Sequence, residues 1–154
     1  MAVADLQAAV DAVWQCIDAL PDSTFNTKYR HDGGPEIDSN SGVLDDMPFV
    51  PAIEVWPGAA LPEWFTNRDQ MTLFTIQIRI WTNGWRTAQP LSLSQQVREK
   101  IWANDPGYIK TATCYHPVRL TMPMFKKAKY GTQKGTQITE TTMLLVLRVK
   151  DDPL

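Results

Sequence analysis

Apolar and polar residues alternate strictly over residues 71–82, MTLFTIQIRIWT, near the middle of the chain. The two alternating sets are Phe74, Ile76, Ile78 and Ile80 on one side and Thr75, Gln77, Arg79 and Trp81 on the other. A period of two predicts a β-strand that turns one face to a core. Because the other face carries guanidinium and indole groups rather than carboxylates, we expect it to be available to a partner.

Two segments show helical periodicity instead. Residues 3–19 carry an apolar stripe at three- and four-residue spacing, formed by Val3, Leu6, Val10, Val13, Trp14 and Ile17. Pro21 ends this segment, because a proline forces the residue before it out of helical geometry. Residues 90–104 form a second amphipathic pattern, with Leu93, Val97 and Ile101 on the buried side. Asn83-Gly84 predicts a turn between the central strand and this helix.

Further strands are predicted on both sides of these elements. Residues 49–56 read as a strand that begins after Pro51 or lies at an edge, and Pro57-Gly58 is expected to break it. Residues 108–125 predict one or two strands interrupted at Pro117 and Pro123. In residues 137–150, Met143, Leu145, Leu147 and Val149 share one face, which predicts a strand deep in the sheet. Its first half, residues 136–142, is polar on both faces, so we expect it to project as an arm with residues 126–131 at the tip.

The predicted fold class is therefore α+β: a mostly antiparallel sheet with two helices packed on one face and a long β-hairpin arm. The 154 residues are enough for one domain, residues 1–154, with a long loop insert at about residues 22–48. The insert contains two turn clusters, residues 32–35 and 38–42. A short strand is expected at residues 25–30, and residues 42–47 are expected to order only against a neighbour.

Composition narrows the function. With 21% charged residues and a formal net charge of -2, the chain lacks the broad basic field that drives general nucleic-acid binding. One local basic cluster stands out, formed by Lys126, Lys127, Lys129 and Lys134. It is either a solvated turn or a contact for an acidic protein surface or for nucleic-acid phosphates. Its glycines lie between two strands, which argues against a phosphate-binding loop.

No enzyme motif is found, and we predict no catalysis, no cofactor and no metal site. Cys16 and Cys114 lack metal-ligand spacing and are expected to be reduced. Cys114 and His116 would share a strand face as a nucleophile and a base, but no third partner with suitable spacing is evident. The N-terminal segment contains two aspartates and no basic leader, which is unlike a signal peptide. No run approaches the roughly 20 apolar residues that a membrane span needs.

Tryptophans cluster around the central strand at positions 56, 64, 81 and 85. Tryptophan and arginine are the residues that most often dominate protein interfaces. Since Arg79 precedes Trp81 closely and Arg86 follows Trp85, we predict an assembly surface here. The candidate interface residues, with the basic cluster included, are Arg79, Trp81, Trp85, Arg86, Lys126, Lys127, Lys129 and Lys134.

The order of elements resembles that of the tail terminator (tail completion) proteins of long-tailed bacteriophages. The resemblance is carried by the helix at residues 3–19, by the central strand at 72–81 that runs through Asn83-Gly84 into the helix at 91–104, and by the closing strand at 137–150. It covers nearly the whole chain but includes no diagnostic motif. The insert at residues 22–48 is longer than the simplest version of the pattern needs, and related head-tail joining proteins share a similar order.

The resemblance implies a structural protein of the virion neck that assembles in the host cytoplasm. Such a subunit forms a ring, a hexamer by analogy, that caps the tail tube, stops its elongation and offers a docking surface to the head connector. DNA would pass through the lumen without sequence-specific binding. Two other readings remain open: a nucleic-acid-binding α/β sandwich that presents Arg79, Trp81 and residues 126–134 on one surface, and a small enzyme with a cleft beside Cys114 and His116.

Overall fold

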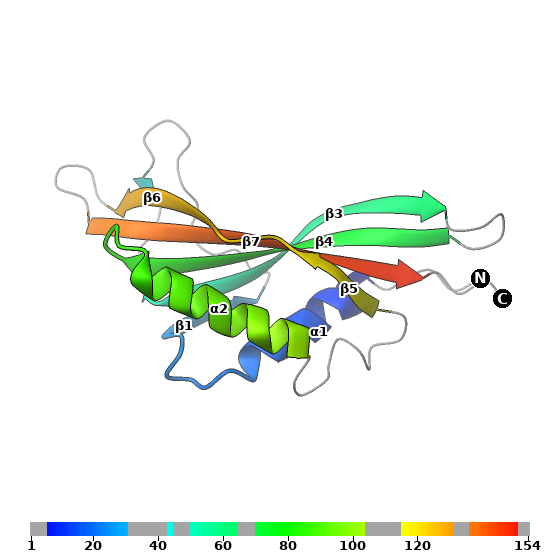
Figure 1. Ribbon diagram of the computed structural model, residues 1–154, viewed down its shortest axis with the longest axis horizontal. Helices are drawn as coiled ribbons and strands as arrows, with labels where there is room; N and C mark the ends of the chain where they lie inside the picture. The colour runs from blue at the N-terminus through cyan, green and yellow to red at the C-terminus, as the bar shows by residue number, and fades with distance from the viewer. Residues whose placement is uncertain are drawn as a thin grey trace.

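A computed structural model describes residues 6–30, 43–44, 50–64, 70–103, 115–130 and 136–150. Within them the chain forms two helices and seven strands (Figure 1). In chain order these are α1 (Leu6–Asp18), β1 (Thr27–Arg30), β2 (Val43–Leu44), β3 (Ala52–Trp64), β4 (Gln70–Asn83), α2 (Ala88–Ala103), β5 (Tyr115–Leu120), β6 (Met124–Tyr130) and β7 (Thr136–Lys150).

The strands form one mostly antiparallel sheet in the order β1-β3-β4-β7-β6-β2, with β5 also paired to β7. Only β1 with β3 and β2 with β6 are parallel among the described pairs. The alternating segment is β4, which lies between β3 and β7 over nearly its full length. β7 pairs with β4 on one side and with β6 and then β5 on the other. The predicted central strand and the predicted deep final strand are therefore confirmed.

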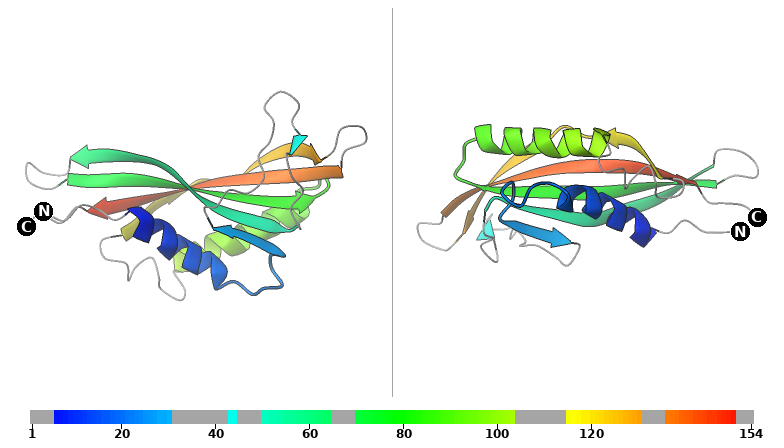
Figure 2. Two further views of the ribbon diagram at one scale, coloured as in Figure 1. Left: turned by 180° about the vertical axis from the view of Figure 1, so that it is seen from behind. Right: turned by 90° about the horizontal axis from the view of Figure 1, so that it is seen from below.

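Both helices cover the same face of the sheet (Figure 2). The apolar stripes of both helices pack against the apolar residues on this face of the strands, as the periodicity predicts. The core contains Val10, Val13 and Ile17 from α1, Leu93, Val97 and Ile101 from α2, and Ile53, Val55, Phe74, Ile76, Ile78, Ile80, Met143, Leu145 and Leu147 from the sheet. The α+β class with two helices on one face is confirmed. None of the helices in the described part of the chain combines the length and the apolar character needed to cross a bilayer.

The predicted break at Pro57-Gly58 is wrong, because β3 continues to Trp64. The register of the β3/β4 pairing shifts between Pro57 and Ala60, and β3 is paired with β4 on both sides of this shift. Gly58 is required there: a Cβ at this position would lie 2.6 Å from the carbonyl oxygen of Thr75. Beyond this shift, the β3/β4 hairpin extends past the two helices (Figures 1 and 2). We call residues 60–64 and 70–74 the β3/β4 arm.

The arm predicted at β6 and β7 is not confirmed. The polar half of β7 is flanked by β4 as far as Ile138 and by β6 as far as Thr136, so it lies within the sheet. Its side chains at Ile138, Thr139 and Thr141 are buried. Thr139 Oγ1 donates a hydrogen bond to the carbonyl oxygen of Gly84 at 2.6 Å, which explains how a polar side chain is accommodated there. Residues 131–135 lie outside the described residues.

Two short strands come from the region of the predicted insert. β1 confirms the strand expected at residues 25–30, and it pairs in parallel with the start of β3. β2, within the segment expected to order only against a neighbour, pairs in parallel with the end of β6 in the same chain. The remainder of residues 31–49 lies outside the described residues. The turn at Asn83-Gly84 is confirmed, with Gly84 at φ 72°.

Candidate functional site

The sheet face opposite the helices carries a row of polar and aromatic side chains across its three longest strands. Register places Ala52, Trp81 and Glu140 side by side on β3, β4 and β7, and Glu54 next to Arg79 one pair further along. This row contains two of the predicted interface residues. The prediction that Trp81 lies on the face away from the main core is confirmed by its place in a separate apolar cluster.

The indole of Trp81 is nevertheless inaccessible, since its exposed fraction is 0%. It packs with Ala52 and Ile138, and the Tyr29 ring meets it edge-on with centroids 6.1 Å apart and planes at 87°. Its Nε1 donates a hydrogen bond of 3.2 Å to Glu140 Oε2. The prediction that this indole is displayed to a partner is therefore wrong: Trp81 stabilises the fold of its own chain.

Arg79 also has its partner within the same chain. Its Nε donates a hydrogen bond of 2.7 Å to Glu54 Oε1, and its Nη2 donates to the same oxygen. The guanidinium carbon lies 5.2 Å from the centre of the Trp81 ring. The Glu54 side chain is 0% exposed and that of Arg79 13% exposed, so the pair is largely removed from water. Arg79 therefore works as a structural cation and is not the free surface arginine that the sequence suggested.

Four of the remaining predicted residues have described side chains, and these are more accessible. Arg86, Lys126 and Lys127 are exposed, and Trp85 is half-buried. Lys127 Nζ lies 5.1 Å from the centre of the Trp85 ring, a cation-π contact between β6 and the turn after β4. Lys126 pairs in register with Glu140 and so lies on the Trp81 face, whereas Lys127 points to the helix side.

The two lysines of the basic cluster whose side chains are described thus lie on opposite faces of β6, and Lys126 but not Lys127 shares a face with Arg79 and Trp81. Lys129 belongs to β6, but its side chain is outside the described part of the chain, as is the whole of Lys134. Of the predicted nucleophile and base, Cys114 and the side chain of His116 lie outside it as well. Among the described residues no group of three or more histidine, cysteine, aspartate or glutamate side chains could hold a metal ion.

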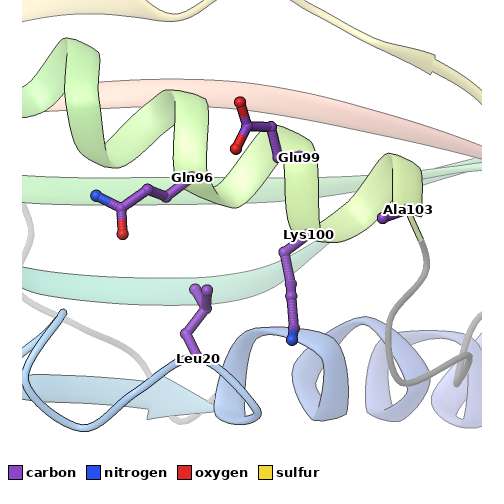
Figure 3. Close-up of a pocket in the computed structure, with 5 residues that line it drawn as sticks. All are labelled: Leu20, Gln96, Glu99, Lys100 and Ala103. Atoms are coloured by element: carbon purple, nitrogen blue, oxygen red, sulfur yellow. The ribbon is translucent and has the colours of Figure 1, made fainter.

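A hollow of about 280 Å³ lies between the end of α1 and the side of α2 (Figure 3). It is lined by Leu20, Gln96, Glu99, Lys100 and Ala103. Gln96 and Lys100 reach from α2 toward α1, while Glu99 points the other way (Figure 3). The lining holds one amide and two opposite charges without a buried polar group directed inward, so it has no evident catalytic arrangement.

An apolar edge was missed by the sequence reasoning. Of the six large apolar side chains that are exposed in the described residues, five belong to α2, β6 and the link between β5 and β6: Leu91 (50% exposed), Trp102 (44%), Met122 (71%), Met124 (59%) and Phe125 (39%). The sixth is Trp56 on β3. Exposed apolar side chains that gather on one side of a molecule mark an interaction surface.

The orientation of α2 explains this gathering. Leu91, Arg98 and Trp102 are spaced by seven and four residues, which places them on one side of the helix. Arg98 Nη1 donates hydrogen bonds to the carbonyl oxygens of Leu120 at 3.2 Å and Thr121 at 2.8 Å, so this side faces the β5/β6 link. The signal in the sequence was a second apolar set on α2, outside the stripe that enters the core.

Comparison with known proteins adds no relative. The chain matches no protein-family model, and a search of curated proteins likewise gives no match.

Proposed function

We propose that this chain is a structural subunit of a bacteriophage neck, a tail terminator that forms a ring on the end of the tail tube. In this role it stops tube elongation and provides the docking surface for the head connector. The proposal starts from the resemblance in element order, and the observed order of helices and strands is compatible with it. The role is one of assembly and involves no catalysis.

The observation that carries the proposal is the β3/β4 arm. β1 pairs with β3 only from Ala52 to Val55, so from Trp56 to Trp64 β3 has β4 as its one described neighbour. A hairpin that extends past the helices is suited to reach an adjacent subunit (Figure 1). Long exposed edges are a liability in a free monomer. A closed ring, in which each subunit contacts the next in the same way, would cover them.

Prolines along the part of β3 that pairs only with β4 fit this role. Pro57 and Pro62 lie on β3, and proline cannot donate a backbone hydrogen bond to an added strand. They would oppose uncontrolled strand addition to the arm before assembly. The contact with the next subunit would then be made by packing of the arm and not by extension of the sheet along β3.

The mass of the purified chain tests the proposal directly. We expect light scattering and native mass spectrometry to show a closed ring, a hexamer by analogy, with or without added tail tubes. A matched variant replaces residues 62–72 by Asn-Gly, which joins the paired positions Leu61 and Leu73 by a short turn. It should keep the thermal unfolding of the subunit but lose the ring. A chain that remains monomeric at every concentration, with and without tail tubes, would refute the proposal.

Hydrogen exchange distinguishes the segments involved. We expect residues 126–137 and 22–48 to change most between monomer and ring, one of them facing the lumen or the next subunit. Equal protection of both segments in the two states would contradict this assignment. A head-tail joining role is the nearest alternative, and it predicts binding to the connector but not to isolated tail tubes.

Nucleic-acid binding is the alternative from a different class. It loses support because Trp81 is buried and Arg79 is paired with Glu54, so that neither is available to stack on bases. The accessible basic side chains Arg86, Lys126 and Lys127 keep it testable. A salt-dependent gel shift with short single strands, abolished by replacing these three side chains with glutamine, would favour it over the assembly role.

A further inference from the structure

We propose that the outer edge of β6 is a docking site for an extended segment of another protein, which adds to the sheet as a strand and carries apolar residues next to acidic ones. The docking segment consists of residues 124–128. This inference does not depend on the role in a phage neck, since it concerns how the edge recognises a peptide and not how many copies form a ring.

On its outer side, this segment is paired with none of the described strands. β7 occupies one side of β6, and β2 covers the other side only at Lys129 and Tyr130. From Met124 to Ala128 no described strand lies on the outer side. In a β-strand, alternate backbone amide and carbonyl groups point away from the neighbour already paired. These groups can form the hydrogen bonds that hold an added peptide.

Other exposed edges are less suited to strand addition. β3 carries Pro57 and Pro62 along its unshared length, and β5 carries Pro117 at a register shift. Each proline removes a backbone donor. The edge strand β1 is four residues long. Residues 124–128 contain no proline, so the docking segment keeps every backbone donor.

Side chains on both faces of β6 would contact the added strand. Met124 lies on the Trp81 face and Phe125 on the helix face, and both are exposed. Met122, just before the strand, and Leu91, on the side of α2 turned toward this edge, extend the apolar surface. An added strand can therefore place one apolar residue on each face, where its burial supplies affinity.

The charges select the partner. Lys126 and Lys127 follow directly and are exposed on opposite faces. If two copies paired through this edge in antiparallel fashion, lysines would approach lysines or apolar residues, which disfavours self-association. A strand with two acidic residues opposite Lys126 and Lys127, and two apolar residues opposite Met124 and Phe125, complements both the charged and the apolar part of the docking segment. We therefore infer a heterologous acidic partner and not a second copy.

Labelled synthetic peptides test the inference. The probes are STVIEETS and STEEIVTS, which present the pattern in parallel and antiparallel orientation, and STVIKKTS and STKKIVTS as charge-reversed controls. A further control is each acidic peptide with alternate backbone nitrogens methylated, which keeps the side chains but removes hydrogen-bond donors. Fluorescence anisotropy with the full chain measures binding up to about 1 mM peptide.

We expect one acidic orientation to bind, with at least about tenfold loss for its lysine counterpart and for its methylated form. Lys126→Gln with Lys127→Gln should weaken binding about five- to tenfold, whereas the exposed control Arg86→Gln should leave it unchanged. Amide exchange at residues 124–128 should slow when the peptide is bound. Met124→Ser should weaken binding of the acidic peptide without changing the unfolding midpoint by more than an exposed substitution does.

Three outcomes would overturn the inference. The first is absence of binding by both acidic peptides. The second is equal binding of the methylated and unmodified forms, which excludes strand addition. The third is a dimer in sedimentation that disappears on Met124→Ser, which would show that a second copy occupies this edge. None of these results bears on whether the chain forms a ring through the β3/β4 arm, so failure of this inference and failure of the proposed function are distinguishable.

Discussion

The ion pair between Glu54 and Arg79 allows a sharp test of the stabilising role of the polar row. In Arg79→Met, the Glu54 carboxylate keeps its buried position, 0% exposed, but loses both guanidinium donors. Removing one partner of a buried ion pair costs about 3–5 kcal/mol, because the remaining buried charge loses its ionic partner. The variant also loses the contact of the guanidinium with Trp81, worth about 0.5–2 kcal/mol.

The expected loss is large relative to the free energy of unfolding of the whole domain. A domain of this class is stable by about 5–15 kcal/mol. For a chain of 150–250 residues each kcal/mol corresponds to about 2–4 °C, so the pair term alone predicts a fall in Tm of about 6–20 °C. Arg79→Lys should lie between wild type and Arg79→Met, since one ammonium keeps the charge but cannot reproduce the two guanidinium donors.

Urea unfolding followed by tryptophan fluorescence provides the measurement, and a double-mutant cycle isolates the pair. Glu54→Met combined with Arg79→Met removes both charges and fills a similar volume, so it should cost less than about 1–2 kcal/mol, far below the sum of the single variants. Lys126→Met is a surface control that should change stability by less than about 0.5 kcal/mol. A cost of Arg79→Met below about 1 kcal/mol would refute the stabilising role of the pair. So would a double variant whose cost equals the sum of the costs of the two single variants.

Substitutions at three further positions test separate features by urea unfolding. Trp81→Phe removes the hydrogen bond to Glu140 in a fully buried site and should cost about 1–3 kcal/mol; a cost below about 0.5 kcal/mol would mean that the bond contributes nothing. Gly84→Ala should cost about 1–2 kcal/mol from backbone strain alone, because φ is 72° and no atom lies within 4 Å of an added Cβ. Gly84→Asn should cost less than Gly84→Ala, and equal stability of the wild type and these two variants would refute the strain argument. Leu145→Ala opens a cavity in the main core and should cost about 2–5 kcal/mol, whereas a value near zero would place this side chain outside the core.

Local chemistry made most elements predictable. The parity of residues 74–80 and of residues 143–147 assigned the core face of β4 and β7 correctly, because a strand must alternate its side chains between two faces. The stripes of α1 and α2 were assigned for the corresponding reason at helical spacing. The strand starts after Pro51 and Pro123 also followed from the missing amide donor of proline. The interruption expected at Pro117 is wrong, because β5 runs from Tyr115 to Leu120 and accommodates this proline at a register shift against β7.

Two errors had tertiary causes. By local rules Pro57-Gly58 should end a strand. In the structure β3 continues, because the pairing with β4 shifts register beside Thr75, which is 17 residues from Gly58 in the sequence. Residues 136–142 look solvated because they are polar. Their place beside β4 and β6 buries Thr139, Glu140 and Thr141, and two of these form hydrogen bonds: Thr139 donates to the carbonyl oxygen of Gly84, and Glu140 accepts from Trp81.

The candidate site shows the same division. The sequence singled out Arg79 and Trp81 by residue type, and parity placed Trp81 on the correct face. Their burial depends on Tyr29, Glu54 and Glu140, which come from β1, β3 and β7. No local rule brings these strands together. The apolar edge was missed for a similar reason, since Met122, Met124 and Phe125 follow no single period.

The sequence by itself determined the identity of the main elements and the side that each turns to the core, because those properties depend on neighbours a few residues apart. Only the tertiary structure decided which polar residues are enclosed, which hairpin extends past the helices and which edge of the sheet is left without a described neighbour. These properties depend on the order and register of strands that are distant in the chain. In this protein, therefore, only the assembled sheet distinguishes the polar and aromatic residues that stabilise the fold from those that are exposed at its surface.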